Sequence, residues 1–484
     1  MGDGGCDPLA NGHQESIERI SGMKNRSQIG CREYTRRSFV GRAAVMGGGA
    51  ALSAAVPSLL IQGKYAEGEV SQVPKREVAA LSAAASGDST TNTAKFSKEF
   101  LSNKAFQDWA LTFEAPGAQS IEEKPGGKTI QTGAVIQPNG DIQFRIFAPK
   151  ATEVKLKFTL VRTGELVLEK RDDGVFEGVL PYDDEHSGPM SVDVYIDGMA
   201  FIYPYLPIHW SAGYPHNFVE VPESDLDFLL IKDVPHGGIT REIFWAEAGQ
   251  SWERCFVYTP PGYAKSTSAY PVLYLQHGAG ENEVVWDHCG KVAYILDNLL
   301  AEKKIVPFIV VMNNNGIRDP NASGQGFGTG DPIFERVLLE SCIPFIEKNH
   351  RVKSTKWDRA LAGLSMGSFQ SCDIGFRHPE LFGSIGTFTA SMTRVGEENN
   401  TRPYKTVMKD PENPGKFGKN YRVYFRSTTP KEDRFETFLA DDKICADAGV
   451  DKLPCYHRVL YSKRTTKWNS WRMGLRDYSQ LIFK

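Results

Sequence analysis

The sequence predicts a mostly parallel β-sheet with helices on both faces, preceded by a small all-β immunoglobulin-like sandwich. From residue 228 onward, short apolar runs alternate with helical patterns, as is typical of a parallel sheet covered on both faces. Between residues 133 and 221, single apolar residues alternate with polar ones, and turn signals recur at hairpin spacing. A chain of 484 residues is too long for one ordinary domain. We therefore expect the sandwich at residues 126–222 and the α/β domain at residues 223–484.

The first 66 residues have the character of an export signal and leader. Thr35-Arg36-Arg37-Ser38-Phe39-Val40 precedes a mild apolar run at residues 43–61, a combination similar to a twin-arginine signal. Three consecutive glycines and a proline interrupt this run, so it is too weak for a permanent membrane span. We expect residues 67–125 to be a linker and an N-terminal extension. These features predict a bacterial protein exported to the periplasm or the medium, the alternative being a disordered leader with a chance arginine pair.

Composition and charge exclude several classes of partner. The chain is 41% hydrophobic and 24% charged with a formal net charge of −3, so neither nucleic acid nor an acidic membrane surface is an expected partner. Its eight cysteines show no C-x-x-C or metal-ligand spacing, which favours buried thiols. A Cys445–Cys455 disulfide is an open alternative. No cofactor and no metal site are expected.

The predicted sandwich is built from short alternating strands. Ile142, Phe144 and Ile146 alternate with polar residues, and further strands are expected at residues 154–158 and 191–196. Four aromatic residues near the end of this region (Tyr203, Tyr205, Trp210 and Tyr214) allow two interpretations. They stack on sugar rings, or they pack at the junction with the next domain.

The α/β domain follows in order. Strands are expected at residues 254–258, 270–275, 305–312, 359–362, 421–426 and 456–461, and helices at residues 292–302, 335–348, 369–378 and 468–483. Gly363-Leu364-Ser365-Met366-Gly367 lies between an apolar strand and a helix, and it matches the G-x-S-x-G nucleophile elbow of α/β-hydrolases. Side chains at Gly363 and Gly367 would collide with neighbouring backbone in so sharp a turn. The turn would hold the Ser365 hydroxyl clear of the sheet at a helix N-terminus.

Acyl transfer at such a site needs a nucleophile, a base, an acid and oxyanion donors. Ser365 is the predicted nucleophile, and the N–H groups of Met366 and Ala279 are the predicted oxyanion donors. Gln276, His277 and Trp286, on the segment that carries Ala279, are assigned to substrate binding. We expect His277 to fix this loop rather than to act as the base.

Several motifs recur together in one family. They are Tyr-Thr-Pro-Pro-Gly-Tyr (258–263), Pro-Val-Leu-Tyr-Leu-Gln-His-Gly-Ala-Gly-Glu (271–281), Gly-Leu-Ser-Met-Gly (363–367), Glu-Asp-Arg-Phe (432–435) and Trp-Asn-Ser-Trp-Arg (468–472). Together they resemble the esterase D-type α/β-hydrolases and, within them, the family 1 carbohydrate esterases, which include feruloyl and acetyl xylan esterases. The preceding segment resembles early-set, glycogen-binding-like domains through Phe-Arg-Ile-Phe-Ala-Pro (144–149), Asp-Asp-Gly-Val-Phe (172–176) and Tyr-Ile-Asp-Gly (195–198). The resemblance implies that Asp433 is the triad acid.

The chain departs from this family at the base. Thr466 occupies the position where the family has histidine, and no histidine follows His457 in the chain. His457 lies in a predicted strand and is a weak alternative base. Lys463 and Lys467 are further alternatives, but a lysine base must be desolvated to lose its proton.

Three functions therefore stay open. The first is a carbohydrate esterase acting on ester-decorated plant polysaccharide, weakened by the lost histidine. The second is a degenerate family member that binds such a glycan without cleaving it. The third is a siderophore esterase of the enterochelin type, because those enzymes pair a similar β-domain with the same fold.

Overall fold

The structure is a computed structural model that describes residues 119–122, 129–159, 164–183, 187–211, 213–221, 227–317, 332–389, 391–393, 402–462 and 467–484. The predicted export signal, and the extension up to residue 118, lie outside the described residues.

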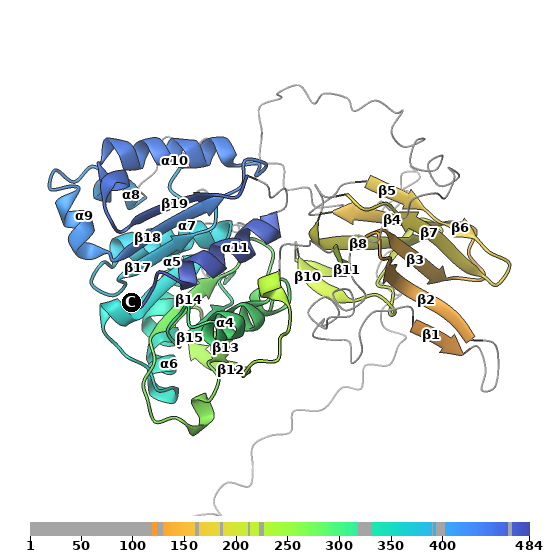
Figure 1. Cartoon of the computed structure of the whole chain (residues 1–484), viewed down its shortest axis with the longest axis horizontal. Coiled ribbons are helices and arrows are strands. Elements are labelled where there is room, and N and C mark those ends of the chain that lie inside the picture. Colours follow the sequence, from red (N-terminus) through yellow and green to blue (C-terminus); the bar gives the residue numbers. More distant parts are fainter. Residues whose placement is uncertain are drawn as a thin grey trace, which may run out of the picture. The chain divides into compact units, whose positions relative to one another are not determined.

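The C-terminal domain is built on one sheet of eight strands within the described residues (Figure 1). In spatial order the strands are β12 (Gly238–Ala246), β13 (Ser251–Thr259), β15 (Ile309–Asn313), β14 (Val272–Gln276), β16 (Arg359–Gly363), β17 (Ser384–Thr387), β18 (Val423–Thr428) and β19 (Tyr456–Leu460). The strands from β15 to β19 pair in parallel, whereas β12 and β13 pair antiparallel. The carboxyl ends of the parallel strands therefore share one edge, where ligands of open α/β sheets bind.

Helices cover both faces of this sheet. They are α3 (Val285–His288), α4 (Val292–Ala301), α5 (Pro332–Arg336), α6 (Ile343–Asn349), α7 (Met366–Arg377), α8 (Tyr404–Val407), α9 (Gly415–Asn420), α10 (Phe435–Asp447) and α11 (Lys467–Ser479), with the π-helix η6 (Val337–Cys342) between α5 and α6. Short 3₁₀ turns are η4 (Asp227–Leu229), η5 (Tyr263–Lys265), η7 (Lys356–Asp358) and η8 (Val450–Lys452). Leu273 and Leu275 of β14 pack toward α4 and α11, whereas Val272 and Tyr274 pack toward α6 and α7. This two-residue alternation gives the domain three layers, with the sheet between two layers of helices.

The β-region consists of two antiparallel sheets. The first sheet contains, in spatial order, β1 (Gln119–Glu122), β2 (Thr129–Ile136), β3 (Ile142–Phe147), β7 (Val175–Leu180) and β6 (Glu169–Lys170). The second contains β10 (Ile208–Ser211), β11 (Tyr214–Val221), β8 (Gly188–Ile196), β4 (Val154–Thr159) and β5 (Gly164–Val167), and β9 (Met199–Phe201) pairs with β8. Phe144 of one sheet and Phe158 of the other meet in a shared core. The first strand lies before residue 126, where we expected the β-domain to begin.

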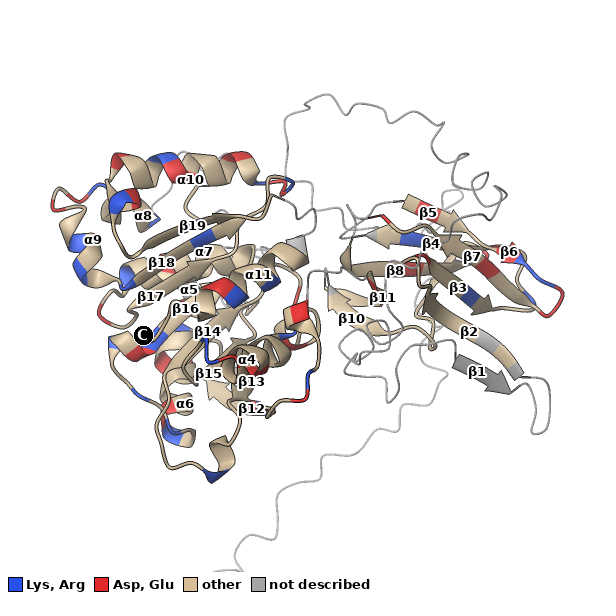
Figure 2. Cartoon of the chain, viewed as in Figure 1, with Lys and Arg blue, Asp and Glu red and all other residues tan. Residues whose placement is uncertain are grey.

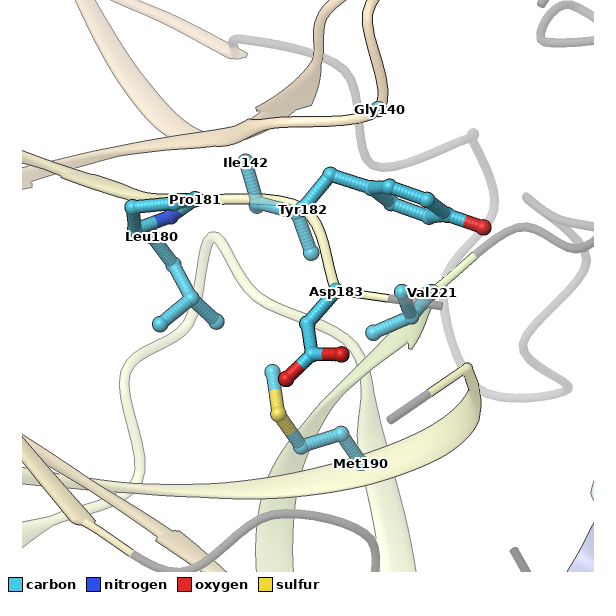
Figure 3. Close-up of a pocket in the computed structure, with 8 residues that line it drawn as sticks. All are labelled: Gly140, Ile142, Leu180, Pro181, Tyr182, Asp183, Met190 and Val221. Carbon is cyan, nitrogen blue, oxygen red and sulfur yellow. The ribbon is translucent and has the colours of Figure 1, made fainter. Parts of the chain in front are cut away.

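A small hollow lies at one end of this core (Figure 3). It is lined by Gly140, Ile142, Leu180, Pro181, Tyr182, Asp183, Met190 and Val221. The side chains of Ile142, Leu180 and Met190 that face it are buried and apolar. The hollow is thus a gap in sheet packing and holds no cluster of catalytic groups.

A buried ion pair joins the β-region to the last helix. Arg472 of α11 donates to both carboxylate oxygens of Glu220 of β11, at 2.7 and 3.0 Å, and to the carbonyl of Cys289 at 2.6 Å. Both charged side chains are almost fully buried. Asn469 donates to Ser187 at 3.2 Å, so the Trp-Asn-Ser-Trp-Arg motif provides the polar part of this contact. Removing one partner of such a buried pair is costly, because the other charge then lies buried without a counter-charge or solvent.

The described residues also bear on the cysteines, the charge distribution and the presence of membrane-spanning helices. The cysteines in the described residues are all free and buried, including Cys445 and Cys455, so the disulfide considered between them is absent. Acidic and basic residues are interspersed along α6 and α10 (Figure 2), in agreement with the small net charge. None of the helices in the described part of the chain has the length and apolar character needed to cross a membrane.

Candidate active site

Ser365 lies in a strained turn between β16 and α7. Its backbone has φ 48° and ψ −115°, a conformation that L-residues rarely adopt outside functional sites. A Cβ on Gly363 would lie 2.5 Å from the Gly367 carbonyl carbon, and a Cβ on Gly367 would lie 2.7 Å from Gln276 Cβ. The predicted steric need for both glycines is therefore confirmed. The Ser365 side chain is partly exposed at the carboxyl edge of the sheet.

Two backbone N–H groups are available beside Ser365. Met366 is the first residue of α7, and first-turn N–H groups have no partner within a helix. Ala279 is exposed on the loop after β14, and within the described residues its N–H has no acceptor. This loop reaches the nucleophile, because a Cβ on Gly278 would lie 3.4 Å from Ser365 Cβ. The predicted donors thus lie on the helix and on the loop that adjoin the serine, where a tetrahedral oxyanion would form.

His277 is used entirely inside this loop. Its Nδ1 donates to the Gly278 carbonyl at 2.7 Å, and its Nε2 accepts the Asn315 N–H at 3.2 Å. Burial lowers the pKa of His277 to about 4, so the ring is neutral at pH 7. With both nitrogens engaged, His277 holds the loop and cannot take a proton from Ser365. It also has no exposed surface for the substrate contact that we assigned to it.

Gln276 and Trp286 require a correction, because we predicted that they contact substrate. Both side chains are almost fully buried, so neither presents a surface to a ligand. Trp286 Nε1 donates to the Gln276 carbonyl at 2.9 Å, and the same carbonyl accepts the Leu364 N–H at 3.3 Å. These residues therefore connect the oxyanion loop to the elbow. An aromatic residue next to a catalytic motif looks the same in sequence whether it faces a pocket or the core.

Glu281 was not among the predicted site residues. Its Oε2 accepts the Gly278 N–H at 2.8 Å, and burial raises the pKa of this carboxyl to about 7. A carboxyl with a raised pKa next to a nucleophile is a common feature of functional sites. Its only sequence signal was its place two residues after Ala279, which does not reveal burial.

Asp433 lies where a triad acid is expected. It is exposed on the loop between β18 and α10, at the same edge of the sheet as Ser365. Because β17 alone separates β18 from β16, the two loops start about 10 Å apart. The chain order Ser365 before Asp433 agrees with the α/β-hydrolase pattern.

No described side chain lies within hydrogen-bonding distance of Ser365 Oγ. Thr466 and Lys463 lie outside the described residues, and nothing is described of the Lys467 side chain. Trp468, two residues after Thr466, packs against Trp286 with ring centroids 5.6 Å apart. The chain on the C-terminal side of Thr466 is therefore anchored beside the oxyanion loop.

The structure does not bring His457 to Ser365. His457 is opposite Phe425 in the edge strand β19, and two strands separate β19 from β16. That separation corresponds to about 14 Å across the sheet. Partial burial lowers the pKa of His457. It is a strand residue rather than a neighbour of the nucleophile.

Comparison with known proteins agrees with this geometry. Residues 250–475, which include the elbow, the oxyanion loop and α11, match the Esterase family model, described as "Putative esterase". Residues 250–475 are therefore similar to this esterase family. This part of the chain thus resembles carboxylic ester hydrolases.

Two curated relatives and one solved structure illustrate the similarity. An endo-1,4-beta-xylanase/feruloyl esterase of Xylanibacter ruminicola is 34% identical over 342 residues, which cover 66% of this chain and 45% of the relative. An esterase of Mycobacterium tuberculosis is 30% identical over 154 residues, 31% of each chain. The enterochelin esterase of Shigella flexneri is similar in fold, with a TM-score of 0.50 and 13% identity over 70% of this chain and 91% of that one. The chain spans less than half the length of these two curated relatives.

The esterase domain also receives a contact from the β10–β11 hairpin. Gly213 at the hairpin turn donates to the Gly280 carbonyl at 2.9 Å, next to the predicted oxyanion donor Ala279. Trp210 and Tyr214 on this hairpin are 39% and 52% exposed, whereas Tyr203 is buried. Tyr203 thus packs in the core of the β-region itself rather than at the junction with the next domain, while the exposed pair is available for ligand stacking.

Proposed function

We propose that this protein is a carbohydrate esterase-like serine hydrolase that acts on ester-decorated plant polysaccharide, with feruloyl or acetyl esters of xylan as substrates. The observation that carries the proposal is the elbow geometry of Ser365 beside two available N–H donors. The 34% identity to a xylanase/feruloyl esterase supports the substrate class. We further propose that the protein is exported through its twin-arginine segment, and that the β-region is an early-set, immunoglobulin-like domain.

The geometry supports acyl transfer through Ser365. Its hydroxyl oxygen would attack the ester carbonyl carbon while the proton leaves for a base, and the carbonyl oxygen would take the negative charge. The N–H groups of Met366 and Ala279 would stabilise that charge, and the positive end of the α7 dipole would add to their effect. Collapse of this tetrahedral intermediate would break the bond to the sugar oxygen, which would take up the proton that left Ser365. Water would then hydrolyse the acyl-enzyme, releasing the free acid and restoring the serine.

The missing histidine favours weak turnover. Loss of the base in a serine triad typically lowers turnover by about six orders of magnitude. The remaining rate, ~10³–10⁴-fold above the uncatalysed reaction in water, comes from binding and the oxyanion hole. Thr466 has no group that can accept a proton at neutral pH. The alternative is a degenerate member that binds decorated glycan without cleaving it, because glycan binding does not require the base.

A panel of esters tests the proposal. A chromogenic acetate, methyl ferulate and a triscatecholate ester are each incubated with the full chain and with Ser365→Ala. Slow hydrolysis of the acetate or feruloyl ester, well below that of a triad enzyme, is the expected result. Hydrolysis of the triscatecholate alone would favour an enterochelin-type esterase. Absence of all three activities, with retained glycan binding, would favour the degenerate binder.

A further inference from the structure

An exposed pair of tryptophans lies on the β12–β13 hairpin of the esterase domain. Trp245 and Trp252 are opposite each other in the antiparallel register, and their rings are 5.6 Å apart at 70°. They are 42% and 69% exposed, and the neighbouring Ile243 is 49% exposed. Exposed apolar side chains that adjoin one another, rather than lying singly, mark candidate binding surfaces. We call Trp245, Trp252 and Ile243 the hairpin platform.

The platform lies at the same edge of the sheet as Ser365. Cys255 of β13 is opposite Asn313, the last residue of β15, so the residues before Cys255 extend past the carboxyl end of the parallel strands. Trp252 is three residues before Cys255, which places it about 10 Å beyond that end. Three strand spacings, about 14 Å, separate β13 from β16. A chain-like substrate held at Ser365 can therefore extend to the platform, whereas a small ester cannot.

An ion pair makes this face continuous with the oxyanion loop. Arg254 follows Trp252 on the exposed face of β13, and its Nε lies 3.0 Å from Glu283 Oε1. Glu283 is buried in the segment that leads from Ala279 into α3. Polar groups thus connect the platform to the predicted oxyanion donor.

Polar side chains hold one indole in place. Trp245 Nε1 donates to Glu247 Oε2 at 2.8 Å, and Gln250 Nε2 donates to Glu247 Oε1 at 2.8 Å. The pKa of Glu247 is lowered by the hydrogen bonds from Trp245 and Gln250, so it is an ionised acceptor at neutral pH. Such an ordered site reduces the entropy lost on binding. Carboxylate and amide groups beside aromatic rings match the alternating hydroxyl and C–H surfaces of a sugar.

We propose that the hairpin platform is an auxiliary binding site for the sugar backbone of a neutral polysaccharide. Sugar C–H groups stack on the electron-rich faces of the two indoles, and Glu247 accepts a hydrogen bond from a hydroxyl. The 70° angle between the rings suits a chain that twists between successive sugars rather than a flat ribbon. Three apolar side chains are too few for a stable protein interface, which normally involves about 20 residues on each side. The sugar class rests on the proposed function.

Binding to soluble xylan and to arabinoxylan in affinity electrophoresis tests this site. All measurements use Ser365→Ala protein, so they do not depend on whether the wild-type chain hydrolyses esters. Trp245→Ala and Trp252→Ala are each expected to weaken binding about five- to tenfold, and Trp252→Phe to retain most of it. Leu439→Ala, which removes a side chain 38% exposed on α10, is the matched control and should leave binding unchanged.

Equal binding by the alanine variants and the parent protein would overturn the proposal. So would a dimer in sedimentation that dissociates on Trp252→Ala, because the platform would then be an interface between copies. Unfolding curves of each variant exclude loss of the fold, and Trp252→Phe keeps the test valid if an alanine variant is unstable. Absence of ester hydrolysis by the wild-type chain would contradict the proposed function but not this site.

Discussion

The indole of Trp286 hydrogen-bonds the carbonyl of Gln276, over 2.9 Å, beneath the loop that faces Ser365. The Gln276 carbonyl also accepts the Leu364 N–H, so it connects the oxyanion loop to the elbow. On its other side the indole packs edge-on against Trp468, which follows the Thr466 position. Three segments of the site thus meet at one buried ring, and their relative placement depends on it.

Removal of that hydrogen bond should lower stability. Trp286→Phe keeps a ring but loses the N–H and part of the buried volume, and we expect a loss of about 1–3 kcal/mol in the free energy of unfolding. Urea denaturation measures it. The control is Trp252→Phe, where a largely exposed indole should change stability by less than about 0.5 kcal/mol. Equal losses in the two variants would show that Trp286 has no special structural role.

Restoration of the family histidine should raise activity. Thr466→His supplies a general base, and such bases contribute about 10²–10⁴ in rate, so hydrolysis of a chromogenic acetate should increase at least about tenfold. Ser365→Ala should change the low native rate little, because without a base that residual rate comes mainly from the oxyanion hole and substrate binding rather than from the serine. In the Thr466→His background, where the serine is activated, Ser365→Ala should abolish the gain. A native rate typical of ordinary esterases, lost on Ser365→Ala, would instead reveal another base.

Glu281 should make stability depend on pH. Burial raises its folded pKa to about 7 from an ordinary value of 4.5, so the folded state binds the proton more tightly than the unfolded state. The free energy of unfolding should therefore fall as pH rises from about 4.5 to 7. Glu281→Gln keeps an acceptor for the Gly278 N–H and cannot ionise.

We expect Glu281→Gln to be more stable than the parent above pH 7, by on the order of 1–2 kcal/mol after allowance for partial exposure. Its stability should vary less between pH 4.5 and 7 in urea titrations at several pH values. A parent and variant with parallel pH profiles would show that this carboxyl keeps an ordinary pKa.

The buried pair between the β-region and α11 should be strongly coupled. Arg472→Met leaves the Glu220 carboxylate buried without its partner, at an expected cost of about 3–5 kcal/mol. Arg472→Met combined with Glu220→Gln should recover a large part of this cost, because no unpaired charge remains. Arg476→Met, whose partner Asp477 is partly exposed, is the control and should cost less than about 1 kcal/mol. A small effect at Arg472 would mean that solvent reaches the pair.

Much of the α/β domain follows from local pattern, but several elements do not. The predicted strand before Ser365 and the helix after it correspond to β16 and α7, because an apolar run and two glycines specify them locally. Strand β17 was missed, since Ser384–Thr387 has four residues with a single large apolar side chain, and it is buried between its neighbours β16 and β18. Strand β12 and helix α10 were missed as well, and the predicted helix at residues 335–348 contains the π-helix η6.

The sequence by itself determined the nucleophile elbow, because Gly363, Ser365 and Gly367 impose their geometry through steric contacts within a few residues. It also determined the α/β class of the C-terminal domain, because apolar strands and helical patterns alternate along the chain. It also indicated that the family histidine is replaced at Thr466. Only the tertiary structure decided that Gln276 and Trp286 are buried supports, that Glu281 has a raised pKa, and that Arg472 pairs with Glu220. Those outcomes depend on contacts between distant segments, 252 residues apart for the ion pair, and on the exclusion of water that packing alone produces.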